Sequence, residues 1–177
     1  MYRALTWLAR RDGVPMDKGV QLGELASANP VDFDTEGRCF IAGTDVTAAI
    51  RRAEIDRLVP VVARHPEVRT VMRERQRELA DDGDVVMEGR DIGTVVVPDA
   101  PVKVYLQADA QVRAGRRLAE RPELSADALA TDRRTRDQSD AARMQPAEDA
   151  VQIDTTNLTV DGVVDQIEQL VREHAPA

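Results

Sequence analysis

The chain lacks the features that mark secreted, disulfide-bonded or membrane-spanning proteins. Cys39 is the single cysteine among 177 residues, so an internal disulfide framework is excluded and a reducing compartment is expected. No apolar run approaches the roughly 20 residues that a membrane-spanning helix needs. No signal-peptide pattern opens the sequence. These absences fit a protein of a reducing compartment that has no membrane-spanning segment.

Aromatic residues and net positive charge are also lacking. Phe, Trp and Tyr make up 3% of the chain, so the core must be built from Val, Leu, Ile and Ala. The 24 basic and 32 acidic residues give a net charge of −8. This balance disfavours a broad surface for nucleic acid or anionic lipid. Any bound anion must therefore be held by a local cluster of arginines.

Common catalytic and metal-binding signatures are missing as well. The sequence contains no phosphate-cradling loop of the form G-x-x-x-x-G-K-[ST], and no G-x-S-x-G, H-E-x-x-H or C-x-x-C. Neither His65 nor His174 stands in a cluster with metal-ligand spacing. We expect both histidines to be structural or solvated, Cys39 to behave as a small apolar residue, and Trp7 to serve in packing.

Hydrophobic periodicity predicts one α/β domain. Helices are expected over 1–12, from Thr47 to about 58, over 66–80 and 110–120, from Ser125 to about 143, and from Thr159 or Asp161 onward. A short hairpin is expected over 31–41, with core strands at 85–87, 102–106 and 151–153. Strands that alternate with helices favour a parallel sheet with right-handed crossovers. Residues 17–47 have a mixed pattern typical of a small insertion.

The first candidate site is the loop Glu88-Gly89-Arg90-Asp91, which follows the apolar run 85–87. Ligands of open α/β sheets bind beyond the carboxyl ends of the strands, so this loop is placed to meet a small phosphorylated molecule. Asp91 can accept from an exocyclic amine while an arginine donates to ring acceptors, which is the hydrogen-bond complement of cytosine. A turn with a surface ion pair is an equally good interpretation of the loop alone.

The second candidate site lies in the predicted helix that ends near residue 143. Arg136, Asp140 and Arg143 are spaced i, i+4 and i+7, so they share one helix face. Two guanidinium groups around a carboxylate suit a phosphorylated sugar, because arginine forks onto phosphate oxygens and aspartate accepts from a hydroxyl. Arginines also suit phosphoryl transfer, in which charge spreads over the moving group. An ordinary solvated charged face explains the same spacing, and more often.

Together these motifs resemble those of bacterial cytidylate kinases, which transfer phosphate from ATP to CMP or dCMP. The resemblance runs from Met1 to about Val171 and includes Tyr2-Arg3, GTDVTAAIR at 43–51, HPEVR at 65–69, EGRDIGT at 88–94, PDAPVK at 98–103, Arg136-Asp137 with Asp140 and Arg143, and IDTT at 153–156. It implies a nucleoside-monophosphate-kinase fold of the P-loop NTPase type, with a parallel sheet and helices on both faces. It also implies a CMP-binding insertion at 17–80 and a mobile lid at 116–146 within a single domain.

The resemblance also assigns site residues and partners. The substrate-binding residues it implies are Tyr2, Arg3, Arg69, Gly89, Arg90, Asp91, Arg136, Asp140 and Arg143. Arg69 and Asp91 would read the cytosine, while Arg136 and Asp140 would hold the sugar or the lid edge. Arg3, Arg90 and Arg143 would grip the phosphate in a pocket lined by Tyr2. Arg136 and Arg143 would also act in catalysis by neutralising the transferred group. The family further implies ATP with Mg²⁺ and a cytoplasmic monomer. Together with the net charge we expect no nucleic-acid or membrane partner, and no cofactor-binding or metal-binding residue is expected in this chain.

The sequence departs from the family pattern in three places. The family's first strand and its glycine-rich loop ending in Gly-Lys do not occur here, and the segment after Arg143 is slightly short. Pro60 stands where the family usually has a base-recognising serine. Since the missing strand would be central and the first helix begins without a cap, we expect a missing upstream segment and an unstable chain. Two other interpretations stay open: a non-catalytic CMP-binding remnant, and an interaction module whose arginine-rich helix docks an acidic partner.

Overall fold

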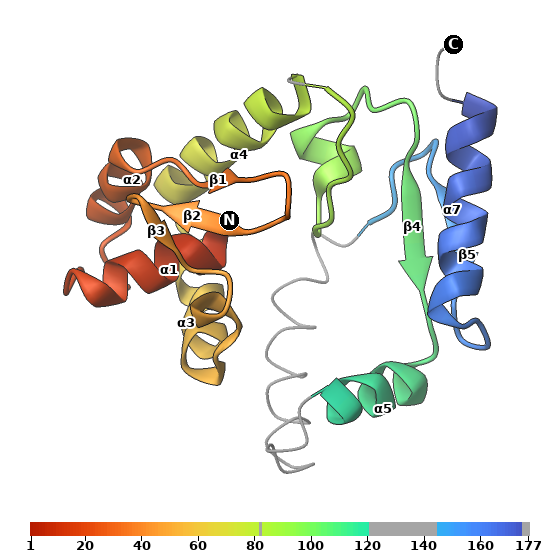
Figure 1. The fold of residues 1–177 in the computed structure, drawn as a ribbon, viewed down its shortest axis with the longest axis horizontal. Helices are drawn as coiled ribbons and strands as arrows, with labels where there is room; N and C mark the ends of the chain where they lie inside the picture. Colours follow the sequence, from red (N-terminus) through yellow and green to blue (C-terminus); the bar gives the residue numbers. More distant parts are fainter. Residues whose placement is uncertain (82, 121–144, 175–177) are drawn as a thin grey trace. The chain divides into compact units, whose positions relative to one another are not determined.

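The computed structural model describes residues 1–81, 83–120 and 145–174 and divides the chain into two compact units, Met1–Val85 (unit 1) and Val86–Ala177 (unit 2). Each is an α/β assembly, and unit 2 contains a parallel sheet, which confirms the predicted fold class (Figure 1). The predicted helix from Ser125 to about 143 lies outside the described residues, as does most of the predicted lid.

Unit 1 surrounds helix α1 with three further helices and a small sheet (Figure 1). Its helices are α1 (Tyr2–Arg11), α2 (Gly19–Ala28), α3 (Ala53–Ala63) and α4 (Pro66–Asp81), with a 3₁₀ turn η1 (Ala49–Arg51). Its strands β1 (Asp32–Phe33), β2 (Cys39–Ile41) and β3 (Thr44–Asp45) form an antiparallel sheet in the order β1-β2-β3. The hairpin predicted over 31–41 is therefore confirmed, and β3 extends it by one strand.

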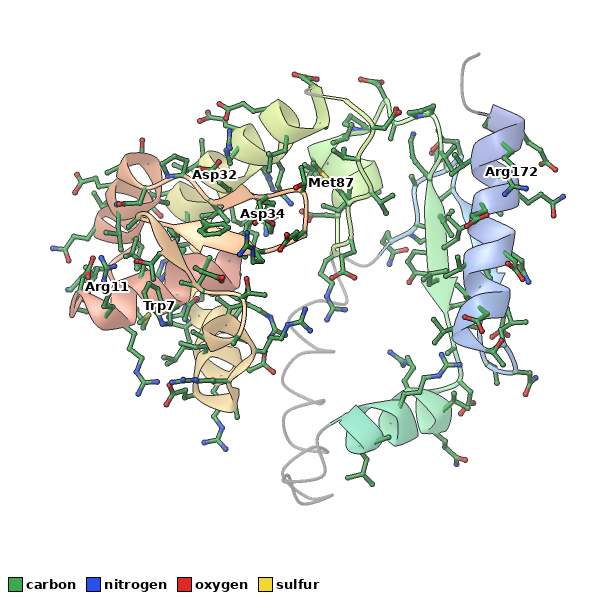
Figure 2. All side chains as sticks on the ribbon, viewed as in Figure 1. Trp7, Arg11, Asp32, Asp34, Met87 and Arg172 are labelled. Atoms are coloured by element: carbon green, nitrogen blue, oxygen red, sulfur yellow. The ribbon has the colours of Figure 1, made fainter. Side chains whose placement is uncertain are left out.

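Helix α1 is buried on two sides. Leu5 and Ala9 pack with α2, α3 and α4, whereas Ala4 and Leu8 pack on the strand region around Ile41. The run of small and apolar side chains in this helix therefore contributes to two cores. Trp7 packs against the second core, and the Arg11 guanidinium lies 5.3 Å from its ring centroid, which confirms the packing role (Figure 2).

Glycine explains why the sequence did not predict helix α2. Gly19 and Gly23 lower helix propensity, yet both allow close approach of α2 to α4. A Cβ on Gly19 would lie 2.6 Å from the Glu67 carboxylate, and a Cβ on Gly23 would lie 3.0 Å from the Glu67 Cβ. Tertiary packing therefore outweighs local propensity in this segment.

The structure corrects the predicted start and the predicted end of helix α3. The predicted helix from Thr47 begins instead at Ala53, after an extended Arg52 at φ −67° and ψ 142°. The Thr47 hydroxyl accepts from the Cys39 amide at 2.8 Å and so holds the sheet instead of capping a helix. Helix α3 also continues through Pro60, beyond the predicted end.

Unit 2 is built on a two-stranded parallel sheet (Figure 1). Strand β4 (Val104–Gln107) pairs in parallel with β5 (Val151–Asp154), with Val104 opposite Val151 and Gln107 opposite Asp154. The other described elements are the π-helical turn η2 (Ile92–Val96), helix α5 (Ala110–Glu120) and helix α7 (Val160–His174). These confirm the predicted strands near 102–106 and 151–153 and the helices at 110–120 and from Thr159.

The predicted strand at 85–87 is wrong. Residues 85–88 carry no assigned secondary structure, and Val86 is 96% exposed. A β-branched apolar run favours an extended chain, but a strand also needs a partner for its backbone groups. No described strand pairs with this segment.

Candidate functional site

Arg3 is the predicted phosphate-binding residue whose surroundings are best defined. It projects from the first turn of α1, and its Nη2 lies 2.7 Å from a carboxylate oxygen of Asp56 on α3. Its Nη1 donates to the Ile50 carbonyl at 3.2 Å. The guanidinium is thus held by two groups from outside its own helix.

Tyr2 lies on α1 and Arg69 on α4, and the two helices contribute to the same hydrophobic core. Tyr2 precedes Arg3 on α1 and packs partly buried against the cluster that contains Leu5 and Met72. Arg69 is half-buried in the first turns of α4, which the His65 ring anchors through a 2.9 Å hydrogen bond with the Met16 carbonyl. This contact confirms a structural role for His65 and fixes the helix end from which Arg69 projects.

In unit 2, the Gly89-Arg90-Asp91 loop leads directly into the turn η2. The Asp91 carbonyl accepts from the amides of Val95 and Val96 at 2.9 and 3.2 Å. A Cβ on Gly89 would lie 2.7 Å from Ile92 Cγ1, so the loop backbone passes close to that side chain. Arg90 is exposed and Asp91 is half-buried, so the loop presents a cation and an anion from an anchored backbone.

The carboxyl edge of the unit 2 sheet carries a second set of polar contacts. The Arg116 guanidinium of α5 donates to the Thr155 hydroxyl at 2.9 Å and to the Thr155 carbonyl at 2.5 Å. The Thr156 hydroxyl donates to the Asp154 carboxylate at 2.5 Å and accepts from the Asp109 amide at 2.9 Å. These bonds join α5 to the loop after β5, the sheet edge where ligands of parallel sheets bind. The resemblance places the IDTT motif here without giving it a role, and the sequence did not single out Arg116.

Hydrogen bonds from Thr156 lower the pKa of the Asp154 carboxyl below its usual range. The Thr156 hydroxyl is the larger cause and the Thr156 amide, at 2.9 Å, is the next. Because the folded pKa is depressed, this contribution to stability is present above the ordinary aspartate pKa of about 3.9 and is lost as the pH falls through the folded value. We expect Thr156→Val to move the pKa of Asp154 upward in a carboxyl-carbon NMR titration.

The Asp149 carboxyl is the internal control for this titration. Its pKa is lowered chiefly by the Lys103 ammonium, which lies 2.5 Å away and does not involve Thr156. The pKa of Asp149 should therefore stay unchanged in Thr156→Val. Equal titration of Asp154 in the two proteins would contradict the role given to the hydroxyl.

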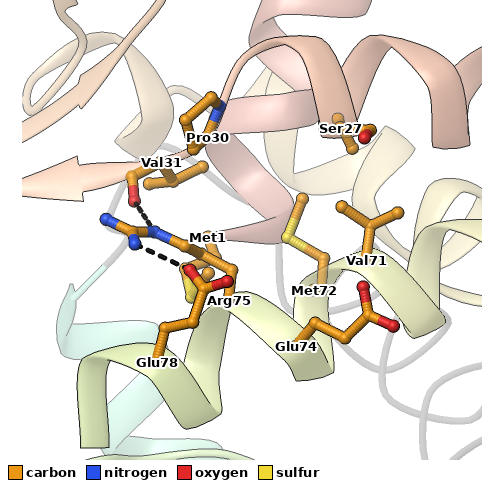
Figure 3. Close-up of a pocket in the computed structure, with 10 residues that line it drawn as sticks. Met1, Ser27, Pro30, Val31, Val71, Met72, Glu74, Arg75 and Glu78 are labelled. Atoms are coloured by element: carbon orange, nitrogen blue, oxygen red, sulfur yellow. Dashed lines mark hydrogen bonds and ion pairs between the residues drawn. The ribbon is translucent and has the colours of Figure 1, made fainter. Parts of the chain in front are cut away.

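A pocket in unit 1 has a lining that does not include Tyr2, Arg3 or Arg69, the predicted substrate residues of this unit (Figure 3). Met1, Pro30, Val31, Glu74, Arg75 and Glu78 are among the residues that line it. Arg75 donates to the Val31 carbonyl and pairs with Glu78 and Asp32, which raises its pKa, with Glu78 as the larger cause. With its arginine neutralised by two carboxylates and Glu74 beside it, this pocket does not suit a phosphate.

The structure thus describes six of the nine predicted site residues. Tyr2, Arg3 and Arg69 lie in unit 1, and Gly89, Arg90 and Asp91 lie in unit 2. Arg136, Asp140 and Arg143 fall outside the described residues. Asp56 could not be singled out from the sequence. It is one aspartate in a charged helical segment, and its arginine partner lies 53 positions away along the chain.

Within residues 1–81, 83–120 and 145–174, no group of three or more His, Cys, Asp or Glu side chains is placed to hold a metal ion. In the same ranges, no helix combines the length and apolar character needed to cross a bilayer.

Comparison with known proteins gives one consistent result. A family model described as cytidylate kinase matches residues 1–173. The cytidylate kinase of Bacillus licheniformis is 40% identical over 187 residues, covering 99% of this chain and 83% of that protein. The Bacillus subtilis enzyme is 39% identical, covering 98% and 82%. A bifunctional pantoate ligase/cytidylate kinase of Synechococcus is 41% identical, with 98% of this chain matched to 35% of that longer protein.

Proposed function

Because this chain belongs to the cytidylate kinase family, we propose that it transfers the γ-phosphate of ATP to CMP or dCMP, giving ADP with CDP or dCDP. The family match over residues 1–173 is the observation that carries this conclusion. In the reaction, a phosphate oxygen of CMP attacks the γ-phosphorus of ATP, and the bond to the β-phosphate oxygen breaks. The protein has to position the two nucleotides and stabilise the negative charge between them.

We assign base recognition to Arg69 and Asp91. A carboxylate accepts from the N4 amine of cytosine, while a guanidinium donates to the ring acceptors on the same edge. Uracil carries an oxygen at the position of that amine, so the carboxylate would disfavour UMP. Pro60 lies within α3 and offers neither a hydroxyl nor an N–H to the base, so selectivity falls on Arg69 and Asp91.

We assign the phosphates to the arginines. Arg3, Arg90 and Arg143 would bind the CMP phosphate, and Arg136 with Asp140 would hold the ribose and its surroundings. Arg136 and Arg143 would also neutralise the group in transfer, as arginines do in other phosphoryl-transfer enzymes. An arginine cluster is the expected device in a protein whose net charge is −8, because the general field repels nucleotides. Tyr2 and Gly89 complete the proposed pocket.

ATP is the proposed phosphate donor, and Mg²⁺ would enter with its phosphates. The 177 residues contain no G-x-x-x-x-G-K-[ST] loop to cradle those phosphates. The alternative function is a protein that binds CMP without phosphorylating it. We also propose that the protein acts as a cytoplasmic monomer.

A coupled assay of ADP release with CMP as the acceptor tests the proposed reaction. ADP release that depends on both CMP and ATP supports the kinase, with UMP expected to be a poorer acceptor. Calorimetric titration with CMP then separates the other possibilities. Binding of CMP without ADP release would identify a non-catalytic CMP-binding protein. The absence of both would support an interaction module and contradict the proposed function.

A further inference from the structure

Two arginine–carboxylate pairs join helix α1 to helix α3, and they differ in burial. Arg10 lies 2.8 Å from Glu54, and both side chains are about half exposed, at 47% and 49%. Arg3 lies 2.7 Å from Asp56, whose side chain is 3% exposed, whereas the Arg3 side chain is 39% exposed. The inner pair therefore has a buried carboxylate and a cation that still reaches solvent.

Burial of the Asp56 carboxylate needs a compensating partner. A buried carboxylate is costly unless it is paired and hydrogen-bonded, and Arg3 supplies that partner. The reverse does not hold, because a partly exposed guanidinium can be solvated by water. An ion pair that only joins α1 to α3 does not need a buried carboxylate, because Glu54 joins the same two helices at the surface.

We propose that Asp56 is a positioning residue that holds the Arg3 guanidinium ready for the phosphate of CMP. This inference rests on the proposed function, which places Arg3 at that phosphate. Arg3 Nη2 forms an ion pair with the Asp56 carboxylate, and Arg3 Nη1 donates a hydrogen bond to the Ile50 carbonyl. A guanidinium is planar and rigid, so contacts at two of its nitrogens fix the orientation of the whole group.

Pre-organisation decides the expected sign of the effect. Ordering an arginine side chain costs conformational entropy. If Asp56 already orders Arg3 before CMP binds, this entropy is not lost on binding and the affinity for CMP is higher. Asp56 also neutralises part of the Arg3 charge, which acts in the opposite direction. Because forked phosphate recognition depends on the orientation of the planar group, we expect orientation to outweigh the lost charge.

The test compares Asp56→Asn with Glu54→Gln, the same carboxylate-to-amide change in the outer pair. Calorimetry measures the dissociation constants of CMP and of cytidine, which has the same base and sugar without the phosphate. We expect Asp56→Asn to weaken CMP binding about tenfold, as for the loss of one charge-assisted contact. Cytidine binding should not change, and Glu54→Gln should leave both constants unchanged.

A double-mutant cycle with Arg3→Gln ties the effect to Arg3. If Asp56 acts through Arg3, then Asp56→Asn should have no further effect on CMP binding in the Arg3→Gln protein. Asp56→Glu keeps the charge and extends the side chain by one methylene. It provides a second test of Asp56 in case Asp56→Asn does not fold. Asp56→Glu should keep the thermal midpoint and lose part of the CMP affinity.

The outcomes separate this inference from the proposed function. Failure of the unaltered protein to bind CMP would overturn both. If the unaltered protein binds CMP, then equal losses for CMP and cytidine in Asp56→Asn would overturn the inference alone and show a merely structural role. Tighter CMP binding by Asp56→Asn would also overturn it, because the carboxylate would then compete with the phosphate.

Discussion

Replacing Arg90 with alanine is expected to weaken CMP binding about 100-fold, since charge-assisted bonds from one guanidinium to a phosphate contribute on the order of 2–3 kcal/mol. Arg90 is exposed on a loop whose backbone is anchored at Asp91 by the amides of Val95 and Val96. The substitution should therefore remove the cation without disturbing the turn that follows it. Calorimetric titration with CMP gives the affinity of each protein.

Arg172→Ala is the matched control for Arg90→Ala. Arg172 is also an exposed arginine of unit 2, and it pairs with Glu168 one turn away on α7 at 2.9 Å (Figure 2). A surface pair of this kind contributes little to stability, and the resemblance gives Arg172 no part in the site. Equal losses of CMP affinity in the two variants would show that Arg90 acts through general charge and would contradict its assignment to the phosphate.

Replacing Leu5 with alanine is expected to destabilise unit 1 by about 2–5 kcal/mol, the usual cost of truncating a buried leucine in a packed core. Leu5 is fully buried in the cluster that joins α1 to α2, α3 and α4. Its loss would leave a cavity that four helices have to close. Urea unfolding followed by the fluorescence of Trp7, the single tryptophan of the chain, reports on this unit.

Val164→Ala is the control for this prediction. Val164 lies on α7 in unit 2 and is 46% exposed, so its truncation removes little buried surface and should leave the Trp7 transition unchanged. A loss below about 1 kcal/mol in Leu5→Ala would contradict the packing of the α1 core.

The two units show what hydrophobic pattern alone can predict. In unit 1 the 16-residue helix α4 follows from its spacing of Val68 and Met72, both of which are buried. Helix α2 does not follow, because its glycines are explained by contact with Glu67, 44 or more positions away along the chain. Local sequence gives the period of a helix, whereas close helix packing depends on partners that are distant in sequence.

In unit 2 the same reasoning predicted too much strand. Residues 85–87 and 104–107 have similar β-branched and apolar character, yet the second run forms a ladder with β5 and the first has no described partner. Strand formation depends on a neighbour that supplies backbone hydrogen bonds, and composition does not reveal that neighbour. Several apolar residues of this unit, including Leu106, Val151 and Val160, remain exposed.

The sequence predicts the residue types of the candidate site, whereas the contacts that hold them appear only in the structure. The order of the motifs proposes Arg3, Arg69, Arg90 and Asp91 as the groups that recognise a pyrimidine nucleotide, and this assignment stays a prediction. The sequence did not predict a role for Asp56, because that role rests on its burial and on its 2.7 Å contact with Arg3. Supporting residues of this kind need a three-dimensional structure to be found.

A crystal structure of the chain with bound CMP would decide whether these residues form one nucleotide site. We expect guanidinium nitrogens of Arg3 and Arg90 within hydrogen-bond distance of the CMP phosphate, and the Asp91 carboxylate at the N4 amine of the base. CMP bound elsewhere, or bound with its phosphate touching neither arginine, would overturn the assignment of this site.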